Sequence, residues 1–226
     1  MKLQQAYDIS QVESVELSPS PAVILFDLDG TLVDTMGAFA DIAADVMAGR
    51  YGLSRRNARQ LYLQTSGVPF CRQLEVIFGV HPENPAAALE FETRKHDVAA
   101  AARLDPATEA ALKALRDKGI KLVVSSNGMQ EHVDAFAERT GLFDLALGFD
   151  GYEGKGEPHV RAVEEKLGVA RDALLFVGDS LRDGEIAAAA GVRFCARAGT
   201  FAAEEFAARF PDAPVVASVA DLASRV

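Results

Sequence analysis

The chain has 226 residues, 49% of them hydrophobic, which is enough for one large domain or for a core domain with a smaller insertion. Its 33 acidic and 23 basic side chains give a formal net charge of −10, so we expect neither a nucleic acid nor an anionic membrane as a partner. No apolar run approaches the roughly 18 residues of a membrane span, and the two cysteines form no metal-type or disulfide pattern, so we expect a reduced, cytoplasmic protein.

Residues 1–20 are polar and run into alternating serine and proline at their end. We expect them to form an N-terminal extension that is mobile and docks weakly. The next residues, Ala22–Phe26, are all apolar and β-prone. Such a run is typical of a central parallel strand that is buried on both faces.

The stretch 35–104 follows this strand and contains no convincing strand of its own. Apolar residues recur at helical spacing in Ala38–Met47, Ser54–Gln64 and Ala86–Ala102. We therefore predict a helical insertion at 35–104.

Strands and helices alternate in the rest of the chain. Short apolar runs predict further strands at Leu122–Val124, Leu174–Val177, Val192–Ala196 and Val215–Ala217. Helix signals lie between them, at Asp105-Pro106 to Gly119, from near Pro158 to Gly168, and from near Gly184 to Gly191. This alternation predicts an α/β fold, a Rossmann-like doubly wound parallel sheet built from residues 21–34 and 105–226.

Two acidic clusters each follow a predicted strand. Asp27 and Asp29 lie on one side of an extended chain, and Gly30 lets the backbone turn after them; Asp179 and Asp183 follow the strand Leu174–Val177. Because the carboxyl ends of parallel strands meet at one edge, four carboxylates gather there and need a hard divalent cation, Mg²⁺. The plainer alternative is that each aspartate caps a helix, which suits one cluster better than two.

Ser126 and Asn127 follow the strand Leu122–Val124 at the same edge. Taken singly, Ser126 is more simply a helix cap, but beside a metal and a phosphate its hydroxyl can bind a phosphoryl oxygen. Lys155 lies in a loop before a helix, where an average lysine is solvated. The residues alone therefore assign Lys155 no role.

Together these residues resemble the haloacid dehalogenase superfamily, in its subgroup of phosphoglycolate phosphatases and β-phosphoglucomutases with a helical cap. The family motifs are DxDGT after a strand, a strand ending in Ser or Thr, a lysine, and GDxxxD. Here they read DLDGT from Asp27, VVSS to Ser126, Lys155, and GDSLRD from Gly178. The resemblance covers roughly residues 22–226 and implies an α/β core with an inserted cap.

The resemblance implies a role for each acidic residue. Asp27 matches the nucleophile that becomes phosphorylated, and Asp29 matches the general acid that later activates water. Asp27, the backbone carbonyl of Asp29, and Asp179 match the magnesium ligands, and Asp183 matches a residue that supports the metal site.

It also implies that Ser126 and Lys155 hold and neutralise the phosphoryl group, with Thr31 and Asn127 as further substrate contacts. Dehalogenases of the superfamily lack an acid at position 29, so Asp29 argues against dehalogenation. Thr31 resembles the phosphatases more than the sugar-phosphate mutases.

One departure from the family pattern concerns the lysine, which is usually followed by proline. This chain reads Lys155-Gly156-Glu157-Pro158, so an alignment anchored on Pro158 would put Glu157 in the lysine's place. Lys155 is preferred because it keeps the family spacing to Leu167-Gly168-Val169.

The insertion matches the cap that excludes water and selects the leaving group in many members of the family. Its arginines are candidates to bind an anionic substrate, although a solvated helix face is the plainer alternative for each: Arg50, Arg55, Arg56, Arg59 and Arg72. Arg72, which follows the turn at 67–70, is the one we select. The four histidines have neither metal spacing nor a nucleophile partner and receive no role.

The leading hypothesis is hydrolysis of a small phosphorylated metabolite by a monomer or homodimer that uses Mg²⁺. A sugar-phosphate mutase that uses the same aspartyl phosphate is the first alternative. A non-catalytic binding module on this fold is the second, and the intact Asp27, Asp29 and Asp179 argue against it.

Overall fold

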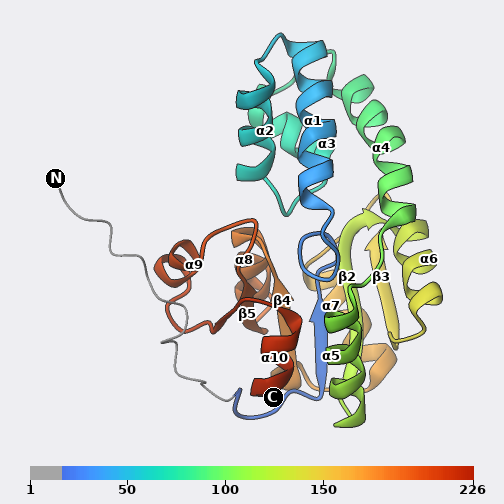
Figure 1. Ribbon diagram of the computed structural model, residues 1–226, viewed down its shortest axis with the longest axis vertical. Coiled ribbons are helices and arrows are strands. Elements are labelled where there is room, and N and C mark those ends of the chain that lie inside the picture. The colour runs from blue at the N-terminus through green and yellow to red at the C-terminus, as the bar shows by residue number, and fades with distance from the viewer. Residues whose placement is uncertain (1–16) are drawn as a thin grey trace, which may run out of the picture.

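The computed structural model describes residues 17–226 and shows a layered α/β core with a group of helices above it (Figure 1). Six parallel strands form the central sheet in the order β3-β2-β1-β4-β5-β6. The strands are β1 (Val23–Phe26), β2 (Lys121–Met129), β3 (Leu145–Phe149), β4 (Leu174–Gly178), β5 (Arg193–Arg197) and β6 (Val215–Val216). This order is doubly wound, and its switch point, where ligand sites form beyond the strand ends, lies between β1 and β4.

Helices cover both faces of the sheet, which is why β1 can be apolar throughout. Ile24 and Phe26 pack on one side, and Val23 and Leu25 on the other, and all four are fully buried. The first face is covered by α5 (Pro106–Asp117), α6 (Gln130–Thr140) and α10 (Val219–Arg225). The second is covered by α7 (Glu157–Leu167), α8 (Leu181–Ala189) and α9 (Ala203–Arg209).

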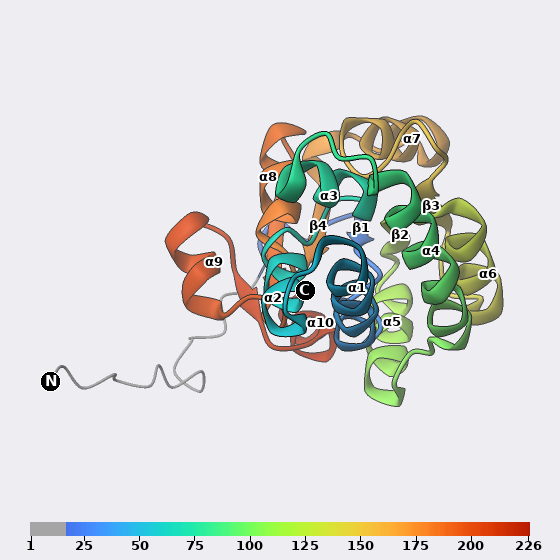
Figure 2. The ribbon, with the colours of Figure 1, turned by 90° about the horizontal axis from the view of Figure 1, so that it is seen from above.

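Four helices between β1 and α5 form what we call the helical cap: α1 (Met36–Tyr51), α2 (Arg55–Gln64), α3 (Phe70–Phe78) and α4 (Asn84–Ala101). They have an apolar cluster of their own, in which the rings of Phe70 and Phe91 lie 4.1 Å apart between centroids. In both views these helices lie over the carboxyl end of β1 (Figures 1 and 2). The cap is therefore placed above the edge of the sheet where the acidic motifs end.

The predicted fold class, a doubly wound parallel sheet with a helical insertion, is confirmed. The boundaries 21–34, 35–104 and 105–226 stay a prediction. The extension expected at 1–20 falls largely outside the described residues. At the start of the described residues, the backbone N–H of Leu17 donates to the carbonyl of Arg225 at 2.8 Å.

Several elements differ from the sequence prediction. Strand β3 and helix α3 were not predicted, and β2 continues through Asn127 to Met129 instead of ending before Ser125. The helix expected near Gly184 begins at Leu181, because Ser180 caps it by accepting a hydrogen bond from the backbone N–H of Asp183. Within residues 17–226, no helix is long and apolar enough to cross a membrane.

Candidate active site

The loop after β1 brings Asp27 to the carboxyl edge of the sheet. Its backbone N–H donates to the carbonyl of Val177 at 2.8 Å, which ties the end of β1 to β4. Gly30 turns the chain with a φ of +90°, and a β-carbon there would collide with the carboxylate of Asp179. Glycine is thus required twice, by the backbone conformation and by the close approach of Asp179.

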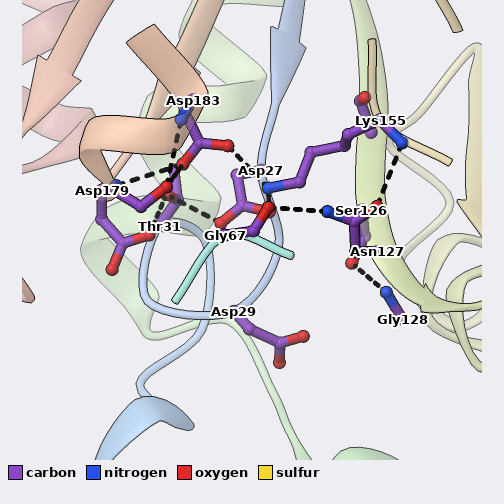
Figure 3. A network of polar contacts seen from close by, with 12 residues as sticks. Asp27, Asp29, Thr31, Gly67, Ser126, Asn127, Gly128, Lys155, Asp179 and Asp183 are labelled. Carbon is purple, nitrogen blue, oxygen red and sulfur yellow. Dashed lines mark hydrogen bonds and ion pairs between the residues drawn. The ribbon is translucent and has the colours of Figure 1, made fainter. Parts of the chain in front are cut away.

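Three carboxylates meet beside Lys155 (Figure 3). One oxygen each of Asp27, Asp179 and Asp183 lies within 4.8 Å of the others, and all three residues are buried. Nζ of Lys155 lies 2.7 Å from an oxygen of Asp27 and 2.7 Å from one of Asp183. The lysine therefore binds two of the three carboxylates directly.

Burial and neighbouring charges shift the pKa values of Asp27, Asp179 and Lys155. Burial raises the pKa of Asp27, the ion pair with Lys155 opposes this shift, and Asp183 and Asp179 add to it. Burial and Asp183 raise the pKa of Asp179 to about 6. Burial alone would lower the pKa of Lys155, but Asp183 and Asp27 outweigh it and the pKa is raised. The lysine stays charged, and three ionised carboxylates around one ammonium would leave an excess of negative charge.

This excess fits a divalent cation. One ammonium faces three buried carboxylates, and oxygen donors of this kind suit Mg²⁺. The side chain of Asp29 points away from the group (Figure 3). Its Oδ1 accepts a hydrogen bond of 2.7 Å from the hydroxyl of Thr35. The carboxylate of Asp29 is thus held outside the cluster, on the side of the cavity.

Ser126 and Asn127 join the site from the end of β2. Oγ of Ser126 is buried and accepts from the backbone N–H of Gly128 at 2.9 Å. Asn127 donates to the carbonyl of Gly67 in the cap at 2.9 Å and accepts from the backbone N–H of Lys155 at 3.1 Å. Asn127 therefore connects the cap loop with the lysine loop.

Thr31 lies beside Asp27 and Asp179. Its hydroxyl is 3.5 Å from an oxygen of Asp27 and 3.4 Å from one of Asp179, and it is buried. This position places Thr31 against the carboxylates and gives it no place in the cavity wall among the described residues.

A cavity of about 60 Å³ lies between core and cap. Its cavity floor, as we call it, comes from core residues Asp27, Ser126, Lys155 and Asp179, with Asp29 and Asn127 beside them. Its cavity roof comes from cap residues Tyr62, Ser66 and Lys95, set among apolar side chains such as Phe39 and Phe91. The space suits a phosphoryl group with a short leaving group, since one water needs about 10–15 Å³ of such volume.

The structure does not bring Arg72 to this cavity. Its side chain is 67% exposed, and its guanidinium pairs with Glu75 of the same helix at 2.7 Å. Arg50, Arg55 and Arg59 likewise pair with carboxylates of the cap. The substrate contact predicted for Arg72 has no support in this arrangement.

Glu157, the competitor of Lys155 in the alignment, lies elsewhere. Its carboxylate pairs with Arg171 at 2.8 Å, where both side chains are partly exposed. Lys155 is the residue that the loop delivers to Asp27.

Sequence reasoning missed residues that lie around the site. The hydroxyl of Thr200 bonds the carboxylate of Asp179. His159 is buried, with Nε2 3.1 Å from the carbonyl of Gly148 and Nδ1 2.8 Å from Oγ of Ser125. Burial lowers the pKa of His159 to about 4, so the ring is neutral: Nε2–H donates to the carbonyl, and Nδ1 accepts from the serine. No sequence pattern around Thr200 or His159 points to these contacts.

Lys95 of the cavity roof was also missed, although a signal existed. Ala87, Phe91 and Lys95 recur at intervals of four in α4 and are all buried, so they share one face of the helix. A lysine in phase with an apolar face is the pattern that would have indicated it.

A family model described as haloacid dehalogenase-like hydrolase matches residues 24–197. The chain belongs to this family. A phosphoglycolate phosphatase of Rhodospirillum rubrum is 30% identical over 190 residues, covering 76% of this chain and 77% of the relative. One of Rhodobacter capsulatus is 29% identical over 183 residues, covering 77% and 83%.

Solved structures share the fold of the chain. A "predicted phosphatase" from Clostridium acetobutylicum has a TM-score of 0.77 at 22% identity, covering 91% of this chain and 98% of its own. CbbY from Rhodobacter sphaeroides, solved with phosphate, has a TM-score of 0.69 at 22% identity, covering 89% and 96%. The family and the phosphatase type of hydrolase predicted from the sequence are confirmed.

Proposed function

We propose that this hydrolase is a Mg²⁺-dependent phosphatase of small phosphomonoesters that works through an aspartyl phosphate on Asp27. The observation that carries the proposal is the position of the Asp27 carboxylate, which faces the cavity and is paired with Lys155 beside Asp179 and Asp183. Because two relatives are named phosphoglycolate phosphatase, phosphoglycolate is the first substrate to test. Residues 35–104 serve as the cap that closes the site.

In the first step an oxygen of Asp27 attacks phosphorus, and the bond from phosphorus to the leaving oxygen breaks. Asp29 gives its proton to that oxygen, so the product leaves as an alcohol. In the second step Asp29 takes a proton from water, which attacks the same phosphorus. The bond from phosphorus to Asp27 breaks, inorganic phosphate leaves, and both carboxyl groups return to their starting states.

The cavity floor offsets the charge of the transferred group. The ammonium of Lys155 and the hydroxyl of Ser126 face the space where the phosphoryl oxygens lie. Asp27, Asp179 and Asp183 would hold Mg²⁺, which when bound neutralises negative charge on the phosphoryl group as a Lewis acid. The cap excludes water from the first step.

Phosphate release from a panel of small phosphomonoesters tests the proposal. We expect release with Mg²⁺, none after chelation by EDTA, and recovery when Mg²⁺ is returned. Calcium should restore much less, because its longer and looser coordination misplaces the reacting groups. A bisphosphate activator that turned phosphate release into isomerisation of a sugar phosphate would show a mutase instead. Full activity in metal-free buffer would contradict the metal requirement.

The covalent step is tested with a substrate labelled in the phosphoryl group and quenched in acid. The wild type and the exposed control Asp172→Asn should retain label on the protein, and Asp27→Asn should retain none. Turnover of Asp27→Asn should fall by on the order of 10⁴-fold or more, because the nucleophile is lost. Label on Asp27→Asn, or substantial turnover by it, would rule out the assigned nucleophile.

A further inference from the structure

Lys95 is a buried cation to which the steps above give no task. The residue is 9% exposed, and its ammonium lies 4.8 Å from the ring centroid of Phe39 and 5.8 Å from that of Phe91. The nearest carboxylate is that of Glu92, at 4.0 Å, which is beyond hydrogen-bond reach. Within residues 17–226 its Nζ makes no hydrogen bond.

An ammonium that lines a cavity on a largely buried side chain, with so few partners, favours an anion that enters the cavity. Contacts with two aromatic rings offset only part of the lost hydration. Ser66 adds to the imbalance, because its Oγ is buried and has no partner in the described chain. Tyr62 lines the same roof, and burial and Asp29 raise its pKa, so its hydroxyl stays a neutral donor. The cavity roof thus presents a cation and two hydroxyls to whatever fills the cavity, together with the amide of Gln73 and the carboxylate of Glu92.

The direction of the reaction decides which part of a substrate meets this roof. In a displacement at phosphorus the attacking and leaving oxygens lie roughly in line. Asp27 attacks from the cavity floor, so the leaving oxygen and its substituent point toward the cap. The groups on Lys95 and Ser66 therefore face the leaving group and not the phosphoryl oxygens.

Charge and volume narrow the class of leaving group. Of the cations that line the described cavity, Lys155 is already bound by Asp27 and Asp183, which leaves Lys95 alone. The ammonium of Lys95, with Glu92 4.0 Å away, can balance at most one carboxylate of a ligand, whereas a second phosphate carries close to two charges and three acceptor oxygens. A cavity of about 60 Å³ also leaves little room beyond a few heavy atoms.

We propose that Lys95, assisted by Ser66, binds a carboxylate on the leaving group, so that the substrates are short phosphorylated hydroxy acids. This assignment rests on the proposed phosphatase function and adds to it the residue that recognises the acid. Lys95 is then a specificity-determining residue: its ammonium forms a charge-assisted hydrogen bond with the substrate carboxylate while the phosphoryl group occupies the floor.

The test compares two substrates of nearly equal size, 2-phosphoglycolate and 2-hydroxyethyl phosphate, which differ in the carboxylate. The wild type should prefer the acid in kcat/KM. Lys95→Met, which keeps the length of the side chain, should lower kcat/KM for the acid by roughly 10- to 100-fold, mainly through KM, and leave the neutral ester nearly unchanged. Lys95→Arg should recover part of the preference. The control Lys113→Met, at an exposed ion pair of α5, should behave as the wild type.

Ser66→Ala provides a milder variant, with an expected loss of roughly three- to tenfold for the acid alone. Ethanediol bisphosphate tests whether the roof binds a second phosphate instead. If the enzyme prefers this substrate and the preference depends on Lys95, the assignment of a carboxylate as the ligand of Lys95 is overturned. Equal losses for acid and neutral ester in Lys95→Met, at unchanged thermal unfolding, would show a structural or acid–base role and overturn the assignment.

A binding measurement separates the two proposals. Calorimetric titration of 2-phosphoglycolate into Asp27→Asn with Mg²⁺ needs no turnover, and adding Lys95→Met should weaken the binding by the same roughly 10- to 100-fold. If the wild type hydrolyses no phosphomonoester, but Lys95→Met still weakens binding in the Asp27→Asn background, only the phosphatase proposal is overturned. Unchanged binding in the double variant would end the role of Lys95 alone.

Discussion

The cavity floor and the cavity roof are built in opposite ways. On the floor each polar side chain is fixed by partners, as Lys155 is by two carboxylates and Asp179 by Thr200. On the roof Lys95 and Ser66 lie among apolar side chains with few polar partners of their own. A fixed floor is what a reaction common to many substrates requires. An unsatisfied roof is what recognition of one kind of substrate requires, because the ligand supplies the missing partner.

Changes on the floor should therefore affect all substrates, and changes on the roof should affect some. Asp29→Ala is the first variant of the floor. It should slow both steps by roughly 10²–10⁴-fold, since general acid–base help is lost. With p-nitrophenyl phosphate the first step should suffer least, because that leaving group needs no proton. Equal losses for good and poor leaving groups in the first step would contradict the acid.

Lys155→Ala is the second test of the floor. It should lower kcat by roughly 10²-fold for acidic and neutral substrates alike, on the scale of one lost electrostatic contact. Lys155→Arg should recover little, because a broad planar fork does not replace a compact ammonium. Glu157→Ala, on the exposed Arg171 pair, is the matched control and should be nearly silent. Steady-state kinetics in which position 157 mattered more than 155 would restore the competing alignment.

His159 lies outside the floor, bonded to Ser125 of β2 and Gly148 of β3, and its effect on stability should depend on pH. Its folded pKa, about 4, lies below the roughly 6.5 of an unfolded chain, so its contribution is full above pH 6.5 and is lost as pH falls toward 4. The difference in free energy of unfolding between the wild type and His159→Gln should thus shrink by roughly 2 kcal/mol from pH 7 to pH 4.5. Denaturant titrations at both pH values check this. His96→Gln, at an exposed histidine, is the control. If its difference from the wild type shrinks by the same amount, His159 is not the cause.

Gly67 holds the roof over the floor. Its φ is +92°, its carbonyl accepts from Asn127 at 2.9 Å, and a β-carbon there would lie 2.6 Å from Cβ of Arg182. Gly67→Ala should lower kcat/KM by about tenfold or more by shifting the cap. Gly79→Ala has open space around it, but its φ of +65° and ψ of −149° are nearly exclusive to glycine; it should lower the free energy of unfolding by roughly 1–3 kcal/mol and leave kcat/KM unchanged. Equal kinetics for both variants would mean that the contact does not seat the cap.

Arg72→Ala should have the smallest effect. The side chain lies on the outer surface of the cap, so kcat/KM for any phosphomonoester should stay within about twofold of the wild type. A large rise in KM would return Arg72 to the substrate and weaken the distinction between roof and surface.

The sequence was enough to bring the aspartates of the floor to one edge of the sheet, because these residues follow strands. Asp27 and Asp179 come directly after apolar runs, and parallel strands bring their ends to one edge. Lys155 was ambiguous, since the loop that carries it has no periodicity, and only the fold shows that it returns to β1. Strand β3 was missed because it lies at the edge, is partly exposed and contains Gly148.

The sequence did not identify the residues of the roof, for a different reason. Arg72 and Lys95 are both cations on cap helices, and their charge alone does not reveal which one faces inward. That depends on how α3 and α4 rotate when Phe70 packs on Phe91, a tertiary contact. Spacing within α4 carried a hint for Lys95, but an apolar face defined by three residues is a weak guide until its neighbour is known.

Thr35 connects the two parts of the molecule. It is the residue on which α1 begins, and its hydroxyl holds the carboxylate of the proposed acid, Asp29, at 2.7 Å. A rotation of the cap about this junction would therefore move the hydroxyl that holds the proposed proton donor. A compound that binds the floor but keeps the cap from closing would then leave Asp29 out of position to protonate its leaving oxygen. The enzyme would then discriminate against such a compound through the rate of the first step as well as through affinity.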